Sequence, residues 1–143
     1  MDCKDLRDES KNQNEPGQPL RVFAAVTDLM FVSKISAAAK QAGCPVEFFR
    51  DAEKLAAAFN GSAPPGPSLV IVDLNNNSLD PLGLITKLKS EPATRQTTVL
   101  AYLSHVQHEL KREAEKAGAD LVLPRSAFSQ NIHEILRQRS CHL

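Results

Sequence analysis

The chain has 143 residues, of which 42% are hydrophobic and 24% charged, as is ordinary for a globular protein. Seventeen basic residues balance seventeen acidic ones, so the net charge gives no reason to expect nucleic acid or an anionic membrane as the principal partner. No apolar run approaches the roughly 20 residues that cross a bilayer, and the polar N-terminus does not resemble a secretory signal. We therefore expect a cytoplasmic protein that does not bind membranes.

The organisation of the chain follows from its composition. Residues 1–19 are polar and rich in Asn, Gln, Pro and Gly, and they cannot bury enough apolar surface to offset the entropy of ordering. We predict a flexible tail over 1–19 and a single domain over 20–143, because no internal repeat or composition break divides the rest.

Short apolar runs alternate with segments of helical periodicity from residue 21 onward. Asp51 and Asp80 are suited to cap two of the helices, with Pro81 at a first helical position, and Gly43 and Gly118 are suited to end two others. The alternation predicts an α/β fold, a doubly wound five-stranded parallel sheet with helices on both faces. The expected strands are 21–27, 45–49, 69–73, 98–103 and 120–123, and the expected helices 31–42, 52–59, 81–89, 106–117 and 129–139.

Polar side chains follow several of these strands. Asp28 and Asp73 end the first and third strands, Ser104 follows the fourth, and Arg125 follows the fifth. The carboxyl ends of parallel strands share one edge of a sheet, where doubly wound folds bind ligands. Two nearby carboxylates repel each other or recruit a hard cation such as Mg²⁺, and a carboxylate can attack phosphorus to give an acyl phosphate.

This constellation resembles the receiver domain of two-component response regulators (CheY-like), over about residues 21–139. Asp73 stands where the family has its phospho-accepting aspartate, and Asn75 matches the position whose backbone carbonyl coordinates magnesium. Ser104 matches the Ser/Thr that turns toward the phosphoryl group. Counted without gaps from Gly118, Arg125 takes the position of the family's lysine. The resemblance implies the flavodoxin-like strand order 2-1-3-4-5.

The resemblance also implies a function. A histidine kinase or phosphotransfer protein would donate phosphoryl to Asp73, with Ser104 and Arg125 assisting, and Mg²⁺ would bind weakly to Asp28, Asp73 and Asn75. Arg125 would pair with Asp73 before phosphorylation. The signal would pass to a partner protein through the face of helix 106–117, strand 120–123 and helix 129–139. Because no output domain fits in the remaining residues, we expect a stand-alone signalling module rather than an enzyme.

Some features favour an alternative reading. Only one acid, Asp28, follows the first strand where the family usually has two, and arginine replaces lysine. An alignment anchored on Pro124 would place Leu123 at the lysine position instead. These departures suit a pseudo-receiver, a protein-interaction module of the same fold that is never phosphorylated. A nucleotide-binding enzyme is disfavoured because the turn 27–30 has no glycine. Asp28 and Ser104 could also serve as helix caps.

Overall fold

The computed structural model describes residues 19–59, 67–76, 79–104 and 107–141. For residues 139–141 it describes the backbone alone. The predicted tail lies outside these ranges except for Pro19, as does most of the proline-rich loop before the third strand. The boundaries of the tail and the domain therefore remain predictions.

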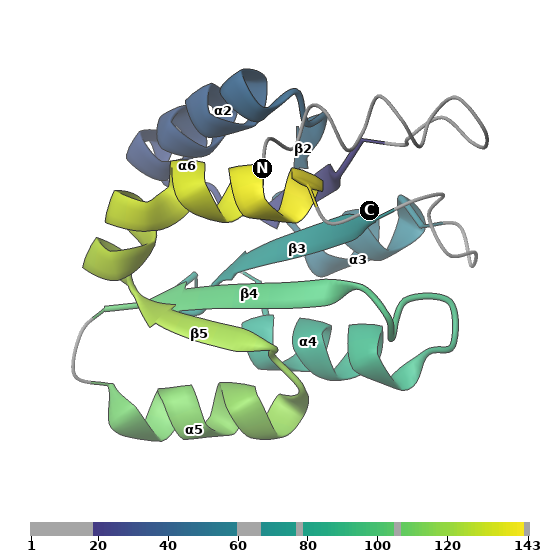
Figure 1. The fold of residues 1–143 in the computed structure, drawn as a ribbon. Helices are drawn as coiled ribbons and strands as arrows, with labels where there is room; N and C mark the ends of the chain where they lie inside the picture. Colours follow the sequence, from purple (N-terminus) through teal and green to yellow (C-terminus); the bar gives the residue numbers. More distant parts are fainter. Residues whose placement is uncertain (1–18, 60–66, 77–78, 105–106, 142–143) are drawn as a thin grey trace.

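The sheet has the predicted architecture. Its strands are parallel and lie in the order β2-β1-β3-β4-β5, which is the expected 2-1-3-4-5 arrangement (Figure 1). β3 is central and pairs with β1 on one side and β4 on the other. The five strands are β1 Arg21–Ala25, β2 Val46–Phe48, β3 Ser68–Asp73, β4 Thr98–Leu103 and β5 Leu121–Pro124.

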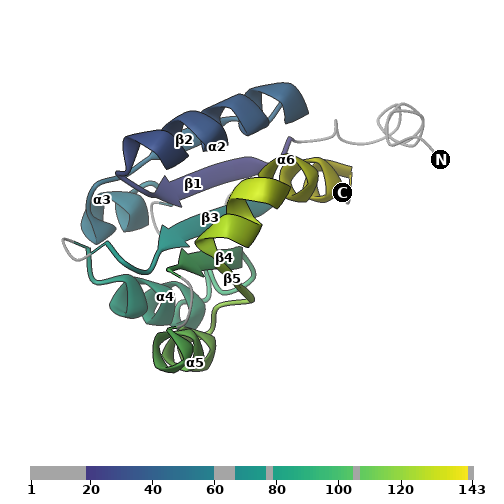
Figure 2. The same cartoon turned by 90° about the vertical axis from the view of Figure 1, so that its left-hand side faces the viewer.

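Helices cover both faces of the sheet. α2 and α6 lie together on one face, and α3, α4 and α5 cover the other (Figures 1 and 2). Among the helices of the described segments, none combines the length and apolar character that crossing a bilayer requires. Their bounds are α2 Leu29–Ala42, α3 Ala52–Ala57, α4 Pro81–Ser90, α5 His108–Ala117 and α6 Arg125–Cys141.

The predicted helix boundaries at four residues are confirmed. The Asp51 carboxylate accepts a hydrogen bond from the Lys54 N–H at 2.8 Å, and Asp80 caps α4 through the Gly83 N–H at 3.2 Å. Gly43 and Gly118 follow α2 and α5 in the left-handed conformation. These local signals fix helix ends because they satisfy backbone groups that the helix itself leaves unpaired.

Three helices begin at residues other than those expected: α2 at Leu29 rather than residue 31, α5 at His108 rather than residue 106, and α6 with the largest difference. α6 begins at Arg125 rather than at Ser129, so residues 126–128 are helical and not a loop. The reason is that Phe128, Ile132 and Leu136, four residues apart, form one buried stripe that includes the segment assigned to the loop. Ser104 does not cap α5, because the N-cap position belongs to Gln107.

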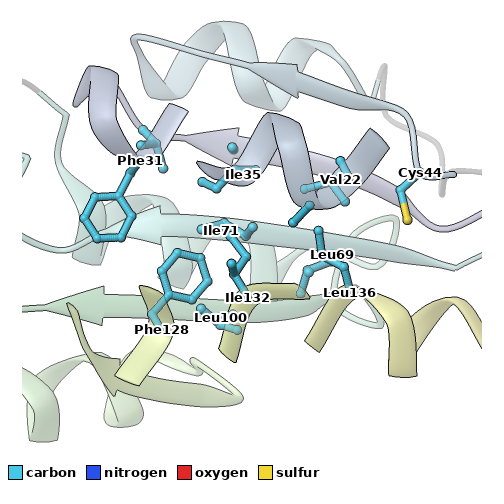
Figure 3. Packing of buried hydrophobic residues seen from close by; sticks show 14 of the residues in the cluster. Val22, Phe31, Ile35, Cys44, Leu69, Ile71, Leu100, Phe128, Ile132 and Leu136 are labelled. Carbon is cyan, nitrogen blue, oxygen red and sulfur yellow. The ribbon is translucent and has the colours of Figure 1, made fainter. Parts of the chain in front are cut away.

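The core forms two layers, one on each face of the sheet. Alternate residues of β3 belong to different layers: Leu69 and Ile71 pack beneath α2 and α6, whereas Val70 and Val72 face the other helices. Figure 3 shows Leu69 and Ile71 among side chains from α2 and α6. Continued by one step, the alternation places Asp73 on the α2 and α6 side.

The apolar stripe of α6 generates a stability prediction. Phe128 is fully buried, so Phe128→Ala should lower the free energy of unfolding by about 3–5 kcal/mol through lost burial and a residual cavity. Met30→Ala, at a side chain that is 61% exposed, should change it by less than about 0.5 kcal/mol. Urea denaturation followed by circular dichroism measures both. Equal midpoints for the two variants would contradict the proposed seating of α6.

Candidate functional site

Asp73 is the last residue of the central strand and is half-buried. Its Oδ1 accepts a hydrogen bond from the Asn75 N–H at 2.9 Å. Burial raises the pKa of the Asp73 carboxyl above its ordinary value; the Asn75 N–H and the Arg125 charge oppose this rise, and the nearby Asp28 charge adds to it. The ionised form of Asp73 is therefore less favourable here than it would be in water.

Asp28 has two roles at once. Its Oδ1 caps α2 by accepting from the Met30 N–H at 2.9 Å, as the capping alternative expected. Its Oδ2 accepts from Nη2 of Arg125 at 3.0 Å. Asp28 thus joins the start of α2 to the start of α6, and both partners of the ion pair are roughly one-third exposed.

Arg125 lies at the site, but with a different partner from the one we expected. The ion pair predicted with Asp73 is made with Asp28 instead, although the Arg125 charge still acts on Asp73. The guanidinium carbon lies 5.0 Å from the centre of the Phe31 ring, a cation–π arrangement that fixes the side chain from a second direction. Leu123, the rival in the alignment anchored on Pro124, packs against the apolar core.

An aromatic trio below these charged groups was not predicted. The Tyr102 ring stacks against both Phe31 and Phe128 with centroid distances of 4.7 and 4.8 Å, and those two rings are themselves 5.9 Å apart. Tyr102 is directly opposite Asp73 in the β3–β4 register and is fully buried. Burial and the Asp73 charge both raise the pKa of its hydroxyl, and among the described residues none makes a well-formed hydrogen bond to that hydroxyl. Its position in the sequence, two residues before Ser104 at the end of the fourth strand, could have indicated that Tyr102 lies near the site.

Ser104 and Asn75 form a second polar network. The Asn75 Oδ1 accepts from the Ser104 N–H at 2.8 Å and lies 3.2 Å from the Ser104 hydroxyl oxygen, which donates to it. The Asn75 Nδ2 donates to Oε1 of Gln107 at 3.0 Å. The Ser104 hydroxyl is therefore bound to Asn75, and Gln107, which the sequence did not single out, connects this network to the start of α5.

The predicted metal ligands come together only in part. Three oxygens of the two carboxylates already accept hydrogen bonds, from Met30, Asn75 and Arg125. Across the described segments, no three or more His, Cys, Asp or Glu side chains form a group that could hold a metal ion. In this arrangement, the donor set of Asp28, Asp73 and Asn75 does not fit a divalent ion unless Arg125 leaves Asp28.

Comparison with known proteins places the fold. No family model matches the chain, and no curated protein matches it by sequence. Solved structures do match: a response regulator receiver domain from Rhodospirillum rubrum has a TM-score of 0.73 at 16% identity, covering 86% of this chain and 95% of its own. The chemotaxis response regulator CheY4 of Vibrio cholerae has a TM-score of 0.70 at 17% identity, covering 85% and 98%.

A third match is a Mn²⁺-bound response regulator, Rcp1, with a TM-score of 0.66 at 12% identity over 85% of this chain and 91% of its own. All three are response regulators or a receiver domain of one. The chain therefore has the flavodoxin-like fold of CheY-like receivers, and the resemblance stated from the sequence is confirmed for the fold.

The raised pKa of Asp73 has a consequence for stability. When a carboxyl group has a higher pKa in the folded than in the unfolded protein, the protein loses stability as the pH rises from the unfolded-state pKa through the folded-state pKa. Asp73→Asn removes that penalty, and its amide oxygen can still accept from the Asn75 N–H. The variant should therefore have a higher urea midpoint than wild type at neutral pH in metal-free buffer, and the difference should shrink toward pH 4. A lower midpoint would mean that the carboxylate stabilises the fold.

Proposed function

We propose that this chain is a receiver-like signalling module that accepts a phosphoryl group on Asp73 from a histidine kinase or phosphotransfer protein and transmits the signal through a partner protein. One observation carries the proposal: a half-buried carboxylate lies at the carboxyl end of the central strand, the Arg125 charge acts on it, and the Ser104 hydroxyl is bonded to Asn75, two residues after it. That edge of a doubly wound sheet is where ligands bind.

The proposed chemistry is a direct transfer. A carboxylate oxygen of Asp73 attacks phosphorus, an Asp73 O–P bond forms, and the P–N bond of the donor phosphohistidine breaks as the imidazole leaves with its electron pair. A carboxyl whose pKa is raised by burial is a better nucleophile than an ordinary surface aspartate, provided that it is ionised.

The modified state would rearrange both polar networks around Asp73. A phosphoryl group adds negative charge and strong acceptor oxygens, which would compete with Asp28 for Arg125 and with Asn75 for the Ser104 hydroxyl. Arg125 begins α6, and the Asn75 network reaches Gln107 at the start of α5. We therefore propose the α5, β5 and α6 surface as the face that a downstream partner reads.

Magnesium enters the proposal as a weak ligand. The response regulator Rcp1 has a Mn²⁺-bound form. Here Asp28, Asp73 and the Asn75 backbone carbonyl would hold Mg²⁺ only after Arg125 released Asp28, and the ion would supply neutralisation of phosphoryl charge.

The second candidate is a pseudo-receiver that binds partners without phosphorylation. Two observations favour it: Asp28 is already neutralised by Arg125, and the Ser104 hydroxyl is already bound by Asn75. In that reading the ion pair is a permanent structural connection between α2 and α6. Neither candidate is an enzyme acting on a separate substrate.

Intact-mass spectrometry after incubation with acetyl phosphate separates the two candidates. The wild-type chain should gain the mass of one phosphoryl group, and the gain is compared with and without Mg²⁺. Hydroxylamine should remove the added group, because an acyl phosphate is labile to nucleophiles. Asp73→Asn should gain nothing, since an amide oxygen does not attack phosphorus under these conditions.

Asp51→Asn is the matched control, because Asn caps a helix about as well as Asp and residue 51 lies at the start of α3. It should be modified as wild type is. No mass gain in the wild-type chain, with acetyl phosphate or with phosphoramidate, would favour the pseudo-receiver.

A further inference from the structure

A cavity lies at the edge of the sheet opposite the candidate site. Ser68, Thr98 and Leu121 are the first residues of β3, β4 and β5, and all three line it. α6 begins at the carboxyl edge and runs back across the sheet, so its far end contributes Ile135 and Gln138 (Figure 1). The cavity has a volume of about 440 Å³, within the range of about 300–1,000 Å³ that is usual for small-molecule sites.

The apolar part of the cavity belongs to the core layer under α2 and α6. Leu20 is 2% exposed and lines the cavity from the start of β1. Leu121 and Ile135 pack against the same layer but are only partly buried. The hollow thus leaves two core side chains partly in contact with water, and a ligand with an apolar body would gain free energy by covering them.

The polar part of the cavity is uncharged. The described residues that line it include no Asp, Glu, Lys, Arg or His, and its polar groups are two hydroxyls and the amides of Gln96 and Gln138. Glu134 accepts a hydrogen bond from Nε2 of Gln138 at 3.0 Å and is itself paired with Arg137. An ionised ligand would lose water here without gaining an opposite charge, which is unfavourable.

The turn that carries Gln96 is held in place before any ligand binds. The Thr97 hydroxyl is hydrogen-bonded to that of Ser68, with 2.9 Å between the oxygens, and the Thr97 carbonyl accepts from Nζ of Lys89 at 2.7 Å. Lys89 also forms an ion pair with Asp120 at 2.9 Å. Such contacts are typical of ligand sites, which are usually formed in advance.

We infer that this cavity binds an uncharged planar heterocycle of the nucleobase class. Its ring would lie against Leu20, Leu121 and Ile135, and its polar edge would pair with the amides of Gln96 and Gln138. A primary amide offers a donor beside an acceptor, as glutamine does when it reads the edge of adenine. The inference does not rest on the proposed function, because the two sites lie at opposite edges of the sheet.

NMR titration of the isotopically labelled full chain with adenosine, up to about 5 mM, tests the inference. A small ligand in a cavity of this kind should show a Kd of about 0.1–1 mM. The side-chain amides of Gln96 and Gln138 and the methyl groups of Leu121 and Ile135 should shift saturably, and the Asp73 signals should stay in place.

Two other probes define the ligand class. Adenosine monophosphate, which differs from adenosine by its charged phosphate, should bind about tenfold or more weakly, because no opposite charge lines the described part of the cavity. Cyclohexanol has an apolar body without a donor and an acceptor side by side, and it should also bind more weakly than adenosine.

Variants locate the site. Gln96→Ala should weaken adenosine binding about three- to tenfold, as the loss of one hydrogen bond predicts. Gln130→Ala is the matched control, because Gln130 is an exposed glutamine of α6 that does not line the cavity, and it should bind as wild type does. Ile135→Phe should fill the cavity and abolish the saturable shifts, with circular dichroism confirming the fold. Gln96 is exposed, so the test with Gln96→Ala holds even where Ile135→Phe does not fold.

Three results would each overturn the inference: no saturable shift with adenosine, equal affinity for adenosine and its monophosphate, or equal affinity of wild type and Gln96→Ala. None of them depends on phosphorylation of Asp73. A chain that binds adenosine as expected but gains no phosphoryl mass would contradict only the proposed function.

Discussion

The alternation of side chains along β3 determines on which face of the sheet the Asp73 carboxylate lies. Leu69 and Ile71 face α2 and α6, and the same period turns Asp73 toward that side at the point where the strand reaches the edge of the sheet. A carboxylate placed against an apolar layer needs compensation. The Arg125 charge and the Asn75 N–H stabilise the ionised Asp73 carboxylate, whereas the nearby Asp28 charge destabilises it.

The apolar stripe of α6 positions Arg125 near the two carboxylates. Phe128, Ile132 and Leu136 seat the helix against α2 and the sheet, as Figure 3 shows, and Arg125 lies one turn before Phe128. The Phe31 ring contacts both Phe128 and the guanidinium, so the packing of the core and the position of the cation share one side chain. Loss of Phe128 would therefore disturb the charged edge as well as the core.

Much of the fold could be predicted from local patterns, because strand alternation, Asp caps at residues 51 and 80, and helix-ending glycines act over a few residues. The start of α6 was missed because residues 126–128 were left outside the helix, although Phe128 belongs to its buried stripe. The partners at the site could not be predicted in this way. The sequence offered two carboxylates as partners for Arg125, and the ion pair with Asp28 depends on the packing of α2 against α6, which the sequence does not show.

The two polar networks near Asp73 reach helices on opposite faces of the sheet. The Arg125 network joins α6 to the start of α2, and the Asn75 network joins the end of β4 to the start of α5. Asp73 touches both, through the Arg125 charge and through the Asn75 N–H. A change of charge at this one carboxylate would therefore act on the first turns of three helices, α2 and α6 on one face of the sheet and α5 on the other.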